Sequence, residues 1–191
     1  MTTKPVGLWD MDGSLFDFDG AMRRDLAELA APTEAPIEDL HALQRTAPHI
    51  HRRAALIKRQ PGWWRSLQPI PLGHRLFYAA AAHGFHNVIL TKGPQSSPNA
   101  WTEKLECCQY HFGKDVDVHI VTDKSLVYGR FLYDDYPPYL ENWLAQRPRG
   151  VGIMPATPEN VDFRHPRVLR LHEDNFDEAV RWLLAAKERM P

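Results

Sequence analysis

The chain has 191 residues, of which 43% are hydrophobic and 25% are charged. This length allows one α/β domain with its own core and a small subdomain, and the composition excludes a wholly disordered chain. The 23 basic and 24 acidic residues give a formal charge of −1, so no global field favours a nucleic acid or a membrane surface as partner.

Targeting and redox signals are few. The residues from Met1 to Asp10 form too short an apolar run for a signal peptide, and no stretch reaches the roughly 18 apolar residues of a membrane helix. Cys107 and Cys108 are adjacent and poorly placed to bridge each other, which favours two reduced thiols. We therefore expect a cytoplasmic protein without a membrane or a stable nucleic-acid partner, for which a homodimer remains possible.

Short apolar runs alternate with longer helical segments, as in a parallel sheet covered by helices. The first expected strand, 6–9, is followed by a segment that reads as helices 21–30, 37–46 and 50–58, punctuated by prolines. Beyond it, the expected order is helix 72–83, strand 87–91, helix 98–111, strand 117–121, strand 130–133, helix 136–146, strand 150–154, strand 168–171 and helix 176–189. The sequence thus predicts a core domain of residues 1–18 and 70–191, with residues 19–69 inserted as a small helical cap.

The first strand ends in Asp10-Met-Asp12-Gly13. Open α/β sheets bind ligands outside the carboxyl ends of their strands, which is where we expect Asp10. An ionised carboxylate there can attack phosphorus, and a second one two residues later can act as general acid and then base. Gly13 permits a sharp turn. An EF-hand calcium loop is disfavoured, because its twelfth position would be Ala21 rather than glutamate.

A second acidic pair, Asp134-Asp135, follows the apolar run Phe131-Leu-Tyr. By itself it could be a solvated turn before two prolines. Together with Asp10 and Asp12, it supplies the carboxylates that Mg²⁺ prefers, alongside water and phosphate oxygens. Thr91, at the end of another strand, could donate a hydrogen bond to a phosphate oxygen, and Lys124 could neutralise charge on the transferring phosphoryl group.

The ordered series Asp10-x-Asp12-Gly, Thr91, Lys124 and Asp134-Asp135 resembles the four motifs of the haloacid dehalogenase (HAD) phosphatases. That resemblance implies a Rossmann-like core, with Asp10 as nucleophile and Asp12 as acid and base. It also implies Mg²⁺ on Asp10, the Asp12 carbonyl and one acid of the final pair. The spacing from Lys124 favours Asp135 over Asp134 as the direct ligand.

Within that superfamily, residues 11–18, 61–71 and 122–124 resemble the 5′(3′)-deoxyribonucleotidases. In those enzymes aromatic residues of the cap and first loop enclose the nucleoside, which implies substrate contacts for Phe18 and for Trp63 or Trp64. The chain departs from the pattern at Lys92, where serine is usual. This lysine either changes the choice of substrate or points away.

The predicted function is Mg²⁺-dependent hydrolysis of a phosphomonoester, with a (deoxy)nucleoside monophosphate as the favoured substrate. Two alternatives stay open. One is a HAD phosphatase for another small phosphate, such as a sugar or coenzyme phosphate. The other is a binding protein that keeps the fold without turnover, although the intact pair of Asp10 and Asp12 argues against it.

Overall fold

A six-stranded parallel sheet forms the centre of the protein, in a computed structural model that describes residues 4–37 and 39–188. The strand order is β3-β2-β1-β4-β5-β6, and every neighbouring pair is parallel. The strands are β1 (Val6–Trp9), β2 (His86–Lys92), β3 (Asp117–Val121), β4 (Phe131–Tyr133), β5 (Val151–Pro155) and β6 (Val168–Leu171). Because β2 and β4 flank β1, the direction of winding reverses at β1, which makes its carboxyl end the switch point where such sheets bind ligands.

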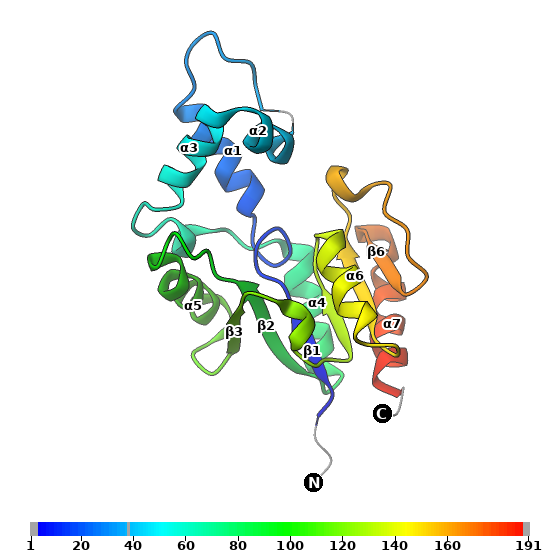
Figure 1. Cartoon of the computed structure of the whole chain (residues 1–191). Helices are drawn as coiled ribbons and strands as arrows, with labels where there is room; N and C mark the ends of the chain where they lie inside the picture. Colours follow the sequence, from blue (N-terminus) through cyan, green and yellow to red (C-terminus); the bar gives the residue numbers. More distant parts are fainter. Residues whose placement is uncertain (1–3, 38, 189–191) are drawn as a thin grey trace.

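Helices cover both faces of the sheet, as Figure 1 shows. The helices of the core are α4 (Pro71–Ala82), α5 (Asn99–Phe112), α6 (Pro137–Ala145) and α7 (Phe176–Glu188). Alternate residues of β1 separate the two layers: Leu8 belongs to the apolar cluster that contains Trp143 of α6, whereas Trp9 belongs to the cluster with Phe77 of α4. Burial on both faces explains why the inner strands β4 and β5 are short, continuous apolar runs.

The cap consists of α1 (Phe18–Glu28), α2 (Leu40–Thr46) and α3 (Pro48–Ile57), which follow β1 and stand over one end of the core (Figure 1). The first helix begins three residues earlier than predicted, because the Asp17 carboxylate accepts a hydrogen bond from Gly20 N at 2.8 Å and caps it. Asp39 caps α2 in the same way through Ala42 N, so that helix starts at Leu40 rather than at residue 37.

The return from the cap is fixed to the core. A short 3₁₀ turn, η1 (Trp64–Ser66), leads back towards α4. The Glu103 carboxylate of α5 accepts hydrogen bonds from Gly62 N at 2.8 Å and Trp64 N at 3.2 Å. This buried acid therefore holds the backbone at the point where cap and core meet.

The predicted α/β fold with a parallel sheet, flanking helices and a helical cap after the first strand is confirmed. The predicted domain boundaries at 18/19 and 69/70 stay predictions. Residue 38 of the predicted helix 37–46, residue 189 of the predicted helix 176–189, and the chain ends 1–3 and 189–191 lie outside the described residues. Among those that are described, no helix combines the length and apolar character needed to cross a membrane.

Candidate active site

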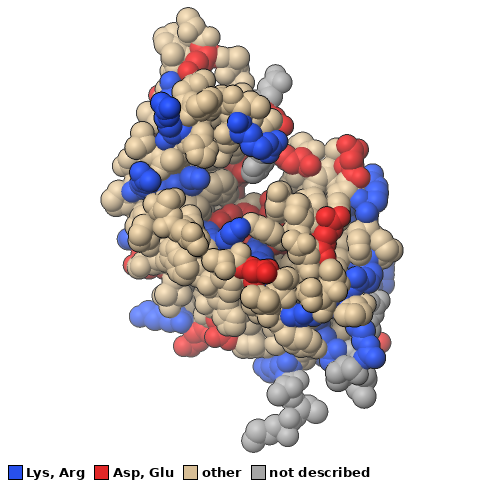
Figure 2. Space-filling view, viewed as in Figure 1, with Lys and Arg blue, Asp and Glu red and all other residues tan. Residues whose placement is uncertain are grey.

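A cavity of about 1590 Å³ lies between the cap and the carboxyl ends of the strands. Figure 2 shows it as a hollow between the upper lobe and the body of the molecule, with acidic and basic side chains near its floor. Residues of α1, the turn after β1, η1, α5 and α6 line it. Its position at the switch point is that of a small-molecule site.

Three predicted acids meet at the floor. Asp10 directly follows β1, and Asp134 and Asp135 directly follow β4, the neighbouring strand. One carboxylate oxygen from each of the three lies within 4.8 Å of the others, so the set could hold a metal ion. Parallel pairing of β1 with β4 explains the convergence, because the two strands end at the same edge of the sheet.

Lys124 joins two of these acids. It lies in the 3₁₀ turn η2 (Lys124–Leu126), and its Nζ donates to Asp10 Oδ1 at 2.5 Å and to Asp134 Oδ2 at 2.6 Å. Burial opposes its positive charge, but the two carboxylates outweigh burial and raise the pKa of Lys124 above its ordinary value. The predicted phosphate-neutralising lysine is thus a permanent cation at the floor of the cavity.

The two acids of the final pair have different surroundings. Both oxygens of Asp134 have protein donors, Lys124 Nζ on Oδ2 and Tyr136 N on Oδ1. Asp135 lines the cavity and uses Oδ1 to accept from Ser14 Oγ at 3.2 Å. A Cβ atom added to Gly13, whose φ is +75°, would overlap Asp135 Oδ2. Glycine therefore serves both the left-handed turn and the close approach of Asp135.

Asp12 also lines the cavity and has an unusual partner, Lys104 of α5, which sequence reasoning missed. Lys104 Nζ donates to Asp12 Oδ2 and, at 2.9 Å each, to Thr91 Oγ1 and Lys92 O. Asp12 Oδ1 is buried without a hydrogen-bond partner among the described residues. The signal in the sequence is the position of Lys104 on the buried face of α5, between Ala100 and Cys108 at helical spacing.

Burial raises the pKa values of the acids. For Asp12, the negative charge of Asp10 adds to burial, while Lys104 opposes both. For Asp134, burial outweighs Lys124 and raises the pKa to about 7. For Asp135, burial and the charges of Asp10 and Asp134 raise the pKa well above its usual range. Crowded, desolvated carboxylates of this kind are typical of functional sites.

The remaining predicted polar residues occupy different places. Thr91 is fully buried and is not among the residues that line the cavity, and its hydroxyl accepts a hydrogen bond from Lys104. Lys92 lines the cavity and is exposed, with Nζ 5.4 Å from the centre of the Tyr139 ring. It therefore points towards the cavity rather than away from it.

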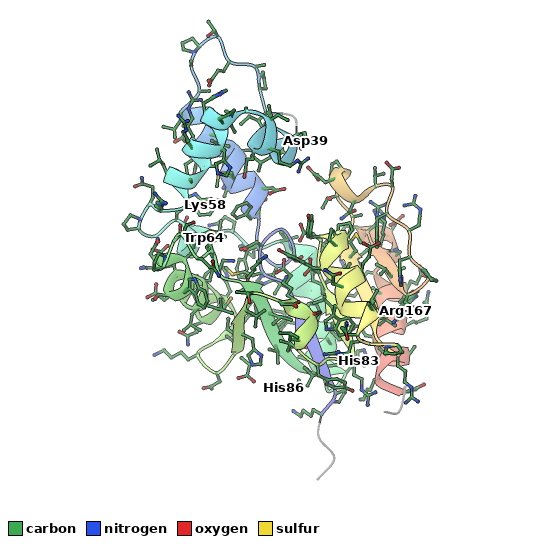
Figure 3. The ribbon with its side chains drawn as sticks, in the orientation of Figure 1. Asp39, Lys58, Trp64, His83, His86 and Arg167 are labelled. Carbon is green, nitrogen blue, oxygen red and sulfur yellow. The ribbon has the colours of Figure 1, made fainter. Side chains whose placement is uncertain are left out.

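The predicted aromatic residues separate as well. Phe18 and Trp64 both line the cavity and stack with centroids 5.5 Å apart, at the junction of cap and core where Figure 3 labels Trp64. Trp63 does not line it, and its indole Nε1 donates to Asp25 Oδ2 inside the cap. A second aromatic pair that was not predicted, Tyr136 and Tyr139, lines the cavity from the side of α6, with centroids 4.9 Å apart.

Comparisons with known proteins agree with this geometry. A family described as 5′ nucleotidase, deoxy (pyrimidine), cytosolic type C matches residues 4–189. A Bordetella pertussis protein named "Putative 5′(3′)-deoxyribonucleotidase" is 30% identical over 162 residues, which cover 81% of this chain and 85% of that protein. A protein of the same name from Bordetella bronchiseptica is also 30% identical, over the same shares of the two chains.

Solved structures show the same fold at low identity. A haloacid dehalogenase-like family hydrolase from Xanthomonas campestris superposes with a TM-score of 0.55 at 16% identity, covering 98% of this chain and 99% of that one. A HAD family hydrolase from Deinococcus radiodurans, solved with bound phosphate and sodium, gives 0.53 at 13% identity, over 94% and 97% of the chains. The chain therefore has the HAD-like hydrolase fold and belongs to the 5′-nucleotidase family of the deoxy, cytosolic type C.

Proposed function

We propose that the protein is a Mg²⁺-dependent phosphomonoester hydrolase that acts through an aspartyl phosphate on Asp10, with (deoxy)nucleoside monophosphates as its substrates. The observation that carries this proposal is the convergence of Asp10, Asp134 and Asp135 at the floor of a cavity that Asp12 also lines. A nucleophile, an acid and base, and a cation site are then all within one cavity.

The residues present fit a divalent cation. Among the described residues, the four acids Asp10, Asp12, Asp134 and Asp135 have ion pairs with two buried ammonium groups, Lys104 with Asp12 and Lys124 with Asp10 and Asp134. A divalent ion would balance the remaining charge, and hard carboxylate oxygens suit Mg²⁺. We propose Asp10, Asp135 and the Asp12 carbonyl as its direct ligands, since Asp134 already has donors on both oxygens. The bound ion would supply charge neutralisation at the phosphate.

In the first step of the proposed mechanism, an Asp10 carboxylate oxygen attacks phosphorus. The bond between phosphorus and the leaving oxygen breaks, and Asp12 gives its proton to that oxygen. Lys124 stays within hydrogen-bond distance of Asp10 and stabilises negative charge on the phosphoryl oxygens. Water then attacks the aspartyl phosphate while Asp12 takes the proton, which releases inorganic phosphate and restores Asp10.

The choice of a nucleotide rests on the walls of the cavity and on the relatives. Phe18 with Trp64 on one side and Tyr136 with Tyr139 on another offer aromatic faces to a base. Similar proteins carry the name of deoxyribonucleotidases. A sugar phosphate would use the same floor but would gain less from these walls, because it has no aromatic ring. We also propose that the protein works in the cytoplasm, as the word "cytosolic" in the family description suggests.

A substrate panel tests the proposal. With Mg²⁺ present, we expect release of phosphate from deoxynucleoside monophosphates in preference to sugar phosphates, reversible loss of activity with EDTA, and no turnover by Asp10→Asn at unchanged circular dichroism. If phosphate is released from sugar or coenzyme phosphates but not from nucleotides, the proposed substrate class is wrong, and the other phosphate takes its place. Turnover by Asp10→Asn close to wild type would refute the mechanism, and an inactive wild-type protein would favour a binding role.

A further inference from the structure

We propose that Lys104 is a positioning residue: it holds the Asp12 carboxyl group against the end of β2 and so fixes the orientation in which Asp12 exchanges a proton with the substrate. This inference rests on the proposed function, because it assigns a role in that reaction. It concerns a residue of α5, a helix that none of the predicted motifs includes.

The donors of Lys104 are fully used. An ammonium group has three N–H bonds, and the three acceptors of Lys104 are Asp12 Oδ2, Thr91 Oγ1 and Lys92 O. Its side chain is only 1% exposed, with Nζ 4.6 Å from the centre of the Trp64 ring. With no donor left and almost no exposure, Lys104 is built to hold protein groups in place rather than to bind substrate.

These bonds connect two separate parts of the chain. Asp12 lies in the loop after β1, whereas Thr91 and Lys92 are the last residues of β2. The preceding residue of α5, Glu103, accepts hydrogen bonds from Gly62 N and Trp64 N. One turn of α5 therefore fixes both the predicted acid and base and the cap junction that carries an aromatic wall of the cavity.

The two oxygens of Asp12 are not equivalent. Lys104 bonds Oδ2, while Oδ1 has no partner among the described residues although it is buried. Asp12 lines the cavity, so the orientation of its carboxyl group decides whether it comes within hydrogen-bond reach of a bound substrate. Lys104 provides the hydrogen bond that the Asp12 carboxylate makes among the described residues, and this bond fixes that orientation.

The test compares Lys104→Met with wild type through kcat/KM, which reports phosphoryl transfer to Asp10. The nucleoside that a nucleotide releases is a poor leaving group, which needs the proton of Asp12, whereas nitrophenolate is a good leaving group and does not. General acid catalysis contributes about 10²–10⁴-fold, so we expect Lys104→Met to lose roughly ten times more on a deoxynucleotide than on nitrophenyl phosphate. In an Asp12→Asn background this difference between the two substrates should vanish, because the residue through which Lys104 acts is gone.

Lys114→Met serves as the matched control, since Lys114 is an exposed lysine just beyond the same helix. It should lose nothing on either substrate. If Lys104→Met does not fold, the same comparison is made with Lys104→Gln, which keeps a polar group but cannot bond all three acceptors. Equal losses on the two substrates would overturn the inference while leaving the phosphatase assignment intact. If the wild-type protein hydrolyses neither substrate, both the inference about Lys104 and the phosphatase assignment are refuted.

Discussion

Ser14 connects the loop after β1 to the acidic pair after β4. It is fully buried, and its hydroxyl donates to Asp135 Oδ1 and accepts from Asp135 N at 3.0 Å. Asn160 supports the same residue from another side, donating to Asp135 O at 3.1 Å. The acid proposed as the direct metal ligand is therefore held by its backbone and its side chain at once, which favours a fixed ligand geometry.

We predict that Ser14→Ala weakens the binding of the Mg²⁺ that supports activity. Loss of a hydrogen bond worth about 0.5–1.5 kcal/mol corresponds to a rise of roughly 2- to 12-fold in the half-saturating Mg²⁺ concentration. A titration of activity against Mg²⁺ measures it. Ser66→Ala is the control, because Ser66 Oγ donates to the Trp63 carbonyl near the cap junction and contacts none of the acids by a hydrogen bond within the described part of the chain. An unchanged titration for Ser14→Ala would mean that Asp135 is not held through this serine.

At the scale of elements, α1 contributes more than a connection to the cap. Asp17 starts the helix at Phe18, which places this ring in the first turn, against Trp64. Arg23, further along α1, reaches across to Glu159 of the core at 3.1 Å. Phe18 and Arg23 both line the cavity, so α1 supplies an aromatic wall and also an ion pair to the core.

Phe18→Ala should raise KM for deoxynucleoside monophosphates while leaving the hydrolysis of a small phosphate without a base nearly unchanged. A base stacked on an aromatic face gains about 1–3 kcal/mol, so the expected rise is roughly 5- to 150-fold. Trp63→Phe is the matched control, since Trp63 belongs to the same aromatic group but does not line the cavity. A comparable rise for Trp63→Phe, or none for Phe18→Ala, would contradict the proposed pocket.

At the scale of the whole molecule, the buried carboxyl groups of the site make the stability of the fold depend on pH. Without a metal ion, burial raises the pKa of Asp134 from 3.8 to about 7. A carboxyl group whose pKa is higher in the folded than in the unfolded state stabilises the fold below the unfolded pKa. This contribution is lost as pH rises through the folded pKa. The metal-free protein should therefore lose stability from this source between about pH 4 and 7.

The stabilisation by Mg²⁺ should accordingly be larger at about pH 8 than at about pH 5.5. Ligand at 100 times its Kd contributes about 2.7 kcal/mol, which corresponds to a gain in Tm of roughly 5–10 °C for a chain of this size. Thermal unfolding with Mg²⁺ and with EDTA at both pH values measures the difference. A gain that is equal at the two pH values would contradict a metal site built on these acids.

The titration of His74 does not affect the comparison of Mg²⁺-dependent stability at the two pH values. Burial lowers the pKa of His74 from 6.5 to about 4, so its contribution to stability is present above pH 6.5 and lost as pH falls towards 4. It acts with and without metal and cancels in the difference between the Mg²⁺ and EDTA curves. Asp135→Asn is the second control, and it should remove most of the Mg²⁺-dependent gain.

The sequence by itself determined the alternation of strands and helices, the insertion of a helical cap, and the acids that follow β1 and β4. Strands β1, β3 and β6 have the predicted bounds because each is short and contains at least two of the residues Val, Ile and Leu. Asp10 and Asp134-Asp135 were predictable for a related reason: parallel strands end at one edge, so acids that follow them must converge.

Only the tertiary structure decided which side chains complete the site. Lys104, Ser14 and Tyr139 lie far from the acids in sequence or stand in no recognisable spacing with them, and packing brings them together. Adjacent residues can also separate, as Trp63 and Trp64 do, because one ring turns to Asp25 and the other to the cavity. Local patterns fix strand ends and helix caps, whereas the partners of a buried charge depend on how α5 and α6 pack against the sheet.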